Sequence, residues 1–197
     1  MSKREAQARA TRDTLLRAGR ELFAAHGYAA VGTEAIVAHA GLTRGALYHH
    51  FRDKRDLFRA VHEQVEEQLT GRVAATVAGI TDPVTLIRVG AGSYLDECQC
   101  PDVIQIALLD APTVLGWPAW REVSERYGLE LIATSLTLVI DAEAMPALPV
   151  RPLAHLLLGA LVEAALLVAN DPDPAAARRR VEPALLGLLD GLLTRHG

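Results

Sequence analysis

One short run of the chain carries a guanidinium, a phenol and an imidazole on one side of a predicted helix. At about 100° per residue, its residues divide into two faces. The outward face holds Arg44, Gly45, Tyr48 and His49, and the packing face holds Ala46, Leu47 and His50. An arginine can pair with guanine through two hydrogen bonds in the major groove, and a tyrosine hydroxyl can donate to a phosphate. Gly45 permits close approach because it has no side chain. These residue types therefore favour recognition of double-stranded DNA.

Two short helices and a glycine turn are expected to position that face. Thr33 and Thr43 each begin a helical run, where a hydroxyl can cap a free backbone N–H group. Between the runs, Gly41 can adopt the left-handed conformation that a sharp helix end requires. Helix N-termini attract phosphate, so both threonines are expected beside the DNA backbone. The stretch from Thr33 to Phe51 thus predicts a helix-turn-helix.

The segment GLTRGALYHHFRDKRDLF resembles the recognition helix and following signature of the TetR family of transcriptional regulators. The resemblance covers roughly Ala10 to Phe58 and is far more specific in order and spacing than a generic helix-turn-helix. It implies that Thr33, Tyr48 and Lys54 hold phosphates. It further implies that base edges or the adjacent backbone are faced by Thr43, Arg44, Gly45 and His49. In that family, the helix after the motif transmits ligand binding by pivoting, which shifts the separation of two recognition helices in a dimer.

Composition predicts an all-α fold. Half of the 197 residues are hydrophobic, only 5% are aromatic, and Ala and Leu are abundant. We expect a three-helix DNA-binding domain over residues 1–52, with a poorly ordered basic arm at 1–10 and a first helix from about Thr11 to His26. A ligand-binding and dimerisation domain is expected over 53–197. Its predicted helices cover 53–78, 83–99, 101–109, 118–141, 151–170 and 174–196.

The charge distribution agrees with this division. Residues 1–60 hold eleven Lys or Arg and six Asp or Glu, a net charge of +5, which leaves −9 for the remainder of a chain whose total is −4. A basic head on an acidic body is typical of a DNA-binding module. Charged N-terminal ends are also common in other proteins. The charge asymmetry therefore supports DNA binding only together with the helix-turn-helix motif.

The last two predicted helices, at about 151–170 and 174–196, carry the features of a dimer interface. The former is apolar on nearly all sides and must be covered. The paired helices resemble the four-helix dimer interface of the family, while a purely intramolecular core is the alternative. A homodimer also suits a palindromic operator, because the two half-sites match the two-fold axis of the protein.

The body offers apolar segments with a few polar groups, which is the usual composition of a small-molecule site. The candidate ligand-binding residues are Tyr94, Gln105, Asp110, Trp117, Trp120, Tyr127 and Glu163. Each of them can equally be a core residue. Glu163 is the most informative, because an acid among apolar neighbours must be paired or protonated, or must face an interface or a ligand.

No cofactor, metal or membrane partner is expected. Cys98 and Cys100 are predicted to be reduced cysteines at a helix end, with a thiol-reactive sensor as the alternative. The polar N-terminal sequence does not resemble a signal peptide. The apolar run from Leu153 to Asn170 contains His155 and Glu163 and falls short of an ordinary membrane span. We therefore expect a cytoplasmic protein.

These observations predict a transcriptional regulator that binds DNA, and they favour a repressor released from a palindromic operator by a small, largely apolar effector. A ligand-independent DNA-binding protein is one alternative. An enzyme is a weaker one, since no Gly-rich phosphate loop, G-x-S-x-G or H-E-x-x-H motif is present and His49 and His50 are expected on opposite faces. The effector, the operator sequence and the direction of regulation are not encoded in any motif that we recognise.

Overall fold

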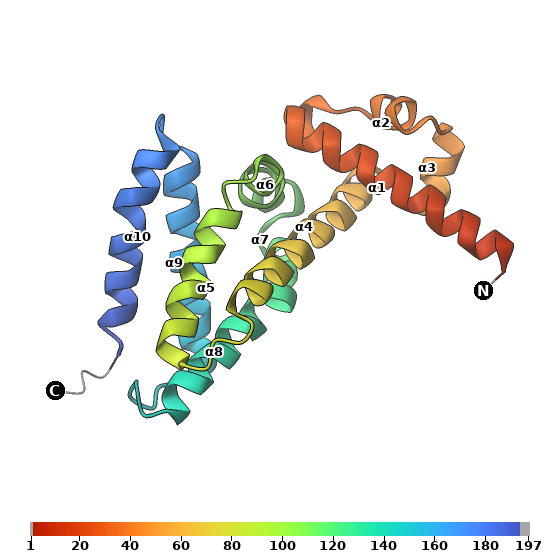
Figure 1. The fold of residues 1–197 in the computed structure, drawn as a ribbon. Coiled ribbons are helices and arrows are strands. Elements are labelled where there is room, and N and C mark those ends of the chain that lie inside the picture. Colours follow the sequence, from red (N-terminus) through yellow and green to blue (C-terminus); the bar gives the residue numbers. More distant parts are fainter. Residues whose placement is uncertain (1, 194–197) are drawn as a thin grey trace. The chain divides into compact units, whose positions relative to one another are not determined.

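Residues 2–193 are described by a computed structural model, and every regular element among them is helical (Figure 1). The elements are α1 (Lys3–Ala30), α2 (Thr33–Ala40), α3 (Arg44–His50), α4 (Lys54–Val77), α5 (Pro83–Glu97), η1 (Val103–Asp110), α6 (Ala111–Leu115), α7 (Trp117–Ser124), η2 (Glu125–Leu129), α8 (Glu130–Asp141), α9 (Val150–Ala169) and α10 (Pro174–Asp190). The predicted all-α class is confirmed.

The chain divides into two compact units. The first contains the chain up to Val65 together with Pro101–Trp120, and the second contains Glu66–Cys100 together with the chain from Arg121 onward. The boundary within α4 and the return of 101–120 to the first unit do not coincide with the predicted division after residue 52. The predicted division separates residues that bind DNA from residues that bind a ligand or a second protomer, and it stays a prediction.

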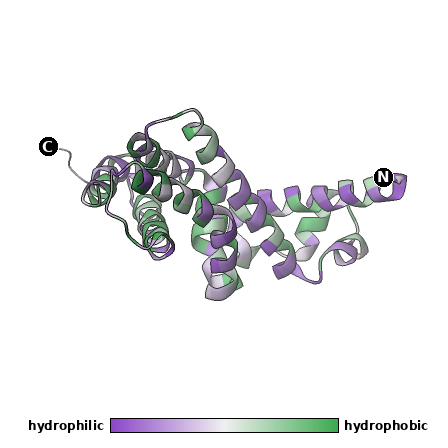
Figure 2. Cartoon of the chain, turned by 90° about the horizontal axis from the view of Figure 1, so that it is seen from below, coloured by the Kyte–Doolittle hydropathy of each residue, from purple (hydrophilic) through white to green (hydrophobic). Residues whose placement is uncertain are grey.

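Helix α1 begins at Lys3 rather than near Thr11. The Ser2 hydroxyl accepts from the Glu5 N–H at 3.2 Å, and the Glu5 carboxylate accepts from the Ser2 N–H at 2.9 Å, which forms a reciprocal capping box. The expectation of a poorly ordered arm is therefore wrong for residues 3–10, while Met1 lies outside the described residues. These first turns are mostly hydrophilic and exposed (Figure 2).

A small core holds the first unit together. Its fully buried side chains include Leu15, Leu16, Phe23, Ile36, Leu47, Leu57 and Phe58. The ring of Phe58 meets Phe23 at 5.2 Å and Tyr28 at 5.0 Å between centroids, both edge to face. This apolar packing fixes α2 and α3 against α1 and the start of α4.

The η1–α6 segment is tied to the same unit by polar contacts. Arg20 of α1 pairs with Asp102. Arg55 of α4 donates to the backbone carbonyls of Val114 and Leu115 at 3.0 and 2.7 Å, where α6 ends. The segment therefore contacts both the first helix of the predicted DNA-binding domain and the helix that follows it.

The second unit is built from the remaining helices. Asp82 caps α5 by accepting from the Thr85 N–H at 2.8 Å. Arg88 of α5 pairs with Asp190 of α10 at 2.5 Å. Such partly exposed pairs contribute little free energy, so burial of apolar side chains must supply most of the stability. Among those buried are Leu95, Leu136, Leu158, Leu161 and Leu185.

Two of the predicted helices contain π-helical turns. The predicted helix over 118–141 consists of α7, the π-helical turn η2 and α8, and the predicted 101–109 helix is the π-helix η1. The predicted final helix at 174–196 ends as α10 at Asp190, and 194–196 lie outside the described residues.

Helix α9 has the length and composition of a membrane span, with a mean hydropathy of 2.0 over its most apolar window. The expectation that this run falls short of a span is wrong by that criterion. One such helix is weak evidence for a membrane protein, because helices that pack in soluble proteins pass the same test. In this structure, 39% of the window is buried.

Candidate nucleic-acid interface and effector site

The corner between α2 and α3 has the predicted geometry. Gly41 is left-handed, with φ 63° and ψ 31°, and its N–H bonds the Ala38 carbonyl at 3.2 Å. The Leu42 N–H bonds the Val37 carbonyl at 2.9 Å, so both carbonyls at the end of α2 find donors. The prediction that Gly41 ends the first helix of the motif, α2, in a left-handed conformation is confirmed.

Only one of the two threonines caps a helix. The Thr43 hydroxyl accepts from the Ala46 N–H at 3.2 Å and caps α3, as predicted. The cap of α2 is Gly32, which provides no side-chain bond, so the prediction that Thr33 caps this helix is wrong. Thr33 is the first helical residue, and its hydroxyl donates instead to Glu34 Oε2 at 3.1 Å. Phosphate contacts by either threonine stay a prediction.

The faces of α3 follow the predicted periodicity. Leu47 is fully buried, and Ala46 and His50 are half-buried. The exposed side of the helix consists of Arg44, Gly45, Tyr48 and His49. The side that was predicted to read DNA is thus exposed.

Arg44 is held on two sides while remaining exposed. Its Nη1 lies 3.0 Å from Glu34 Oε1 on α2, and its guanidinium lies 5.5 Å from the ring centroid of Tyr48, one turn further along α3. The side chain is 63% exposed. A hydrogen bond with Tyr48, followed by the negative charge of Glu34, raises the pKa of Arg44. The guanidinium is therefore charged and partly ordered before any DNA binds.

Lys54 has an internal role that the sequence did not reveal. Its Nζ donates to the carbonyls of Tyr28 and Val31, each at 2.9 Å, and lies 3.9 Å from the ring centroid of Tyr28. Burial lowers the pKa of this amine. Lys54 thus joins the start of α4 to the end of α1, and its predicted phosphate contact stays a prediction.

The two adjacent histidines of α3 lie close together, although the sides of the helix that carry them differ in exposure. Their ring centroids are 5.0 Å apart. His49 is exposed and His50 is half-buried. Burial first, then the charges of His49 and Arg12, lower the pKa of His50. Residues 2–193 contain no group of three or more His, Cys, Asp or Glu that could hold a metal ion.

Two predicted effector residues are occupied in joining η1 to α1. Asp110 Oδ2 accepts from the Tyr28 N–H at 2.7 Å. Gln105 lies against Gly27, where an added Cβ would come within 3.2 Å of Gln105 Nε2. The structure brings these two residues together, but at a contact with the DNA-binding helices. Their predicted role toward an effector is not tested by this arrangement.

The two tryptophans form a pair with their ring centroids 5.0 Å apart. Trp117 is 63% exposed, whereas Trp120 is 6% exposed. The Trp120 indole N–H is buried and finds no hydrogen-bond partner among the residues that the structure describes. An orphaned N–H of this kind costs free energy unless a ligand or water accepts from it.

The remaining candidates belong to three other helices. On α5, the Tyr94 hydroxyl bonds the Cys98 thiol, and burial raises the pKa of that thiol to about 12. Such a thiol is a poor nucleophile at neutral pH, which disfavours a thiol-reactive role for Cys98. Tyr127 is half-buried in η2, and Glu163 is exposed on α9.

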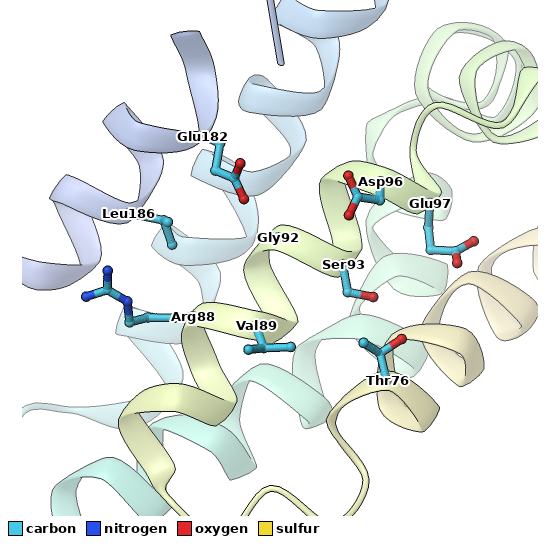
Figure 3. Close-up of a pocket in the computed structure, with 9 residues that line it drawn as sticks. All are labelled: Thr76, Arg88, Val89, Gly92, Ser93, Asp96, Glu97, Glu182 and Leu186. Atoms are coloured by element: carbon cyan, nitrogen blue, oxygen red, sulfur yellow. The ribbon is translucent and has the colours of Figure 1, made fainter. Parts of the chain in front are cut away.

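A groove that the sequence did not predict lies in the second unit (Figure 3). It has a volume of about 500 Å³, and α5 lines it opposite Glu182 and Leu186 of α10, with Thr76 of α4 at its side. Its carboxylates already have partners, since Glu97 pairs with Arg72 and Glu182 with Arg178. None of the predicted effector residues lines it.

Comparison with known proteins places both parts of the chain in one family. Residues 15–61 match "Bacterial regulatory proteins, tetR family", and residues 84–192 match "Tetracyclin repressor-like, C-terminal domain". A solved TetR-family transcriptional regulator from Pectobacterium atrosepticum is 34% identical, with 99% of each chain covered and a TM-score of 0.85.

Two more distant relatives share most of their length with this chain. The Transposon Tn10 TetC protein of Escherichia coli is 25% identical over 162 residues, 82% of each chain. The SmeT–triclosan complex shares the fold, with 23% identity, a TM-score of 0.71 and coverage of 95% of this chain and 93% of the other. Two matched regions that together span most of the sequence, with a helix-turn-helix of the expected geometry, show that the chain belongs to the TetR family of DNA-binding transcriptional regulators.

Proposed function

We propose that the protein is a repressor that binds a partly palindromic operator as a homodimer and leaves it when a small, largely apolar effector binds. The observation that carries the proposal is the exposed face of α3, where Arg44 is accessible and contacts Glu34 and Tyr48. A positioned guanidinium can form the bidentate contact that distinguishes guanine from other bases. Family membership supports DNA as the partner of this face.

The last two helices support a homodimer. On α9, an exposed stripe at helical spacing consists of Leu156, Gly159, Glu163 and Leu167, and on α10 a similar stripe consists of Ala184, Gly187, Leu188 and Gly191. Leu156, Leu167 and Leu188 are 73%, 54% and 66% exposed. Small residues beside exposed leucines let two helices approach closely, and burying the leucines gives the contact its free energy. Glu163 lies within this stripe, which suits an interface better than an enclosed cavity.

The orphaned indole N–H of Trp120 supports a small effector. A ligand oxygen that accepts from this group would remove the cost of leaving it buried and unpaired. The SmeT relative was solved with triclosan, so the fold accommodates a small aromatic molecule. We infer that the effector offers an acceptor oxygen and an apolar body, and that the protein acts in the cytoplasm, where its DNA is found.

The DNA part of the proposal is tested by selection from a pool of random duplexes, followed by fluorescence anisotropy with the selected duplex. Wild type should prefer that duplex to random DNA. In Arg44→Ala, the preference should fall by about tenfold or more. Tyr48→Phe is the companion variant for the predicted phosphate contact, because it keeps the ring beside Arg44 and removes the hydroxyl. It should weaken binding to all duplexes alike.

The effector part is tested by screening phenols and other small apolar molecules for release of the selected duplex. A true effector should also change the fluorescence of wild type, and Trp120→Phe should weaken its binding while leaving operator affinity unchanged. If no compound alters DNA binding and the Trp120→Phe variant behaves as wild type, a ligand-independent DNA-binding protein becomes the better description.

A further inference from the structure

We propose that Glu34 is a specificity-determining residue that acts through Arg44. It holds the guanidinium in the position that reads guanine and keeps it from binding phosphates of any sequence. The proposal rests on operator recognition by α3 and adds a residue of α2 to it.

Glu34 contacts both neighbouring side chains that are predicted to touch DNA. Its Oε1 lies 3.0 Å from Arg44 Nη1, and its Oε2 accepts from the Thr33 hydroxyl at 3.1 Å. Glu34 is on the first turn of α2 and Arg44 is the first residue of α3, so this one carboxylate spans the corner of the motif. The side chain is 69% exposed. It is therefore a negative charge on the face where DNA phosphates would approach.

The contact leaves Arg44 able to bind a base. A guanidinium has five N–H donors in a planar fork, and the Glu34 contact is made through Nη1. The remaining donors can reach the O6 and N7 acceptors of a guanine. The Tyr48 ring, 5.5 Å from the guanidinium carbon, restricts the same group from a second side. Binding guanine from this arrangement costs less side-chain entropy than ordering a free arginine.

The same carboxylate opposes non-specific binding. A phosphate that takes Arg44 away from Glu34 must break the ion pair and leave the carboxylate beside a DNA backbone of the same sign. A guanine edge carries no net charge and can be reached with the ion pair intact. Glu34 thus lowers the affinity for random DNA more than the affinity for the operator, which is the difference that defines specificity.

The test measures anisotropy with three kinds of duplex: the duplex selected by wild type, versions with each guanine replaced in turn, and random DNA. Glu34→Ala should raise the affinity for random DNA and reduce discrimination at one guanine by about five- to tenfold. Glu34→Gln keeps an acceptor oxygen, so its affinity for random DNA and its discrimination at that guanine should lie between those of wild type and Glu34→Ala. In an Arg44→Ala background, Glu34→Ala should cause no further loss at that guanine.

Glu21→Ala is the matched control. Glu21 is another exposed carboxylate of the same compact unit, and it pairs with His39 at 2.6 Å rather than with a predicted DNA contact. Its removal changes the net charge equally and should leave discrimination at each guanine unchanged. Unaltered thermal unfolding of all variants would show that the fold is intact, as expected for exposed side chains.

The outcomes separate this proposal from the one on which it rests. A wild type that binds every duplex equally would overturn operator recognition and the role of Glu34 with it. Clear selection by wild type that is unchanged in Glu34→Ala would overturn only the role of Glu34. The same follows if Glu34→Ala still reduces discrimination at that guanine in the Arg44→Ala background, because Glu34 would then act on DNA without Arg44.

Discussion

The carboxylate of Asp110 accepts a hydrogen bond from the backbone N–H of Tyr28 at 2.7 Å, although 82 positions separate them in the chain. The geometry of Gly27 creates this contact. With φ 75° and ψ 159°, this residue breaks the helical path of α1, so the N–H groups that follow lose their helical acceptors. Asp110 replaces one of those acceptors, and the absence of a side chain at Gly27 leaves room for Gln105.

Replacement of Asp110 by Ala should destabilise the first compact unit. The Tyr28 N–H would lose its partner in a partly buried position, which costs about 1–3 kcal/mol of unfolding free energy. Urea unfolding followed by circular dichroism measures this. Asp13→Ala is the control, because Asp13 is an exposed aspartate of α1 in the same unit, and this variant should be no less stable than wild type. Equal midpoints for both variants would show that the contact contributes nothing.

Lys54→Met should reduce stability because the carbonyls of Tyr28 and Val31 would lose their donor while the aliphatic part of the side chain is kept. We expect a loss of about 1–2 kcal/mol in the free energy of unfolding. The salt dependence of operator binding tests the phosphate contact separately. If Lys54 also neutralises one phosphate, the slope of log K against log salt should fall by about 0.9. An unchanged slope would limit Lys54 to its internal role.

The fold class and the exposed side of α3 were predictable because they depend on local pattern. Helical periodicity separates Leu47 from Arg44 and Tyr48, and Gly41 marks the corner. The start of α1 is also readable in the sequence, since Ser2 and Glu5 have the spacing of a capping box. The charged residues around Ser2 and Glu5 favour a disordered arm. The capping-box spacing and the charged composition therefore favour opposite structures for this segment.

The partners of Asp110, Lys54 and Arg44 were not predictable in the same way. Asp110 and Lys54 bond backbone groups far away in sequence, and a bond to a carbonyl or an N–H leaves no mark on the residue type of its partner. Asp110 was an effector candidate because it is one of the few polar groups among the apolar segments of the body, but a free N–H at a helix break attracts the same residue type. The Glu34–Arg44 pair depends on the angle between two helices, which periodicity alone does not fix.

His50 should make stability depend on pH from about 7 down to its lowered pKa. Its pKa is lowered from the ordinary value of 6.5, so in this range the unfolded chain binds more protons than the folded one. The contribution of His50 to stability is therefore complete above pH 6.5 and is lost as the pH falls toward the lowered pKa. The charged or titratable groups responsible, besides burial, are His49 and Arg12.

The measurement compares wild type and His50→Gln by urea unfolding at pH 7 and pH 5.5. Wild type should lose more unfolding free energy on acidification than the variant does, because glutamine cannot take up the proton. His49→Gln is the companion variant. It removes one cause of the lowered pKa and should reduce the pH dependence in part. A pH dependence that is the same in wild type and His50→Gln would contradict the assignment.

The exposed stripe on α9 and α10 should determine the oligomeric state. Leu156 and Leu188 are 73% and 66% exposed, and a glutamate at either position would place a charge within the proposed interface. We expect wild type to sediment as a dimer and the Leu156→Glu/Leu188→Glu double variant as a monomer with the same helical circular dichroism. Operator affinity should fall on the order of 100-fold, because two tethered readers bind one palindrome far more tightly than one.

Leu138→Glu supplies the matched control for this charge. Leu138 is 43% exposed but belongs to α8 rather than to either stripe, so the variant should remain dimeric and bind the operator as wild type does. If the double variant remains a dimer, the interface lies elsewhere on the chain. If wild type is already a monomer and still binds the palindrome with full affinity, the exposed leucines serve another partner. Monomerisation confined to the double variant, with the loss of operator affinity, would assign these two helices to the dimer.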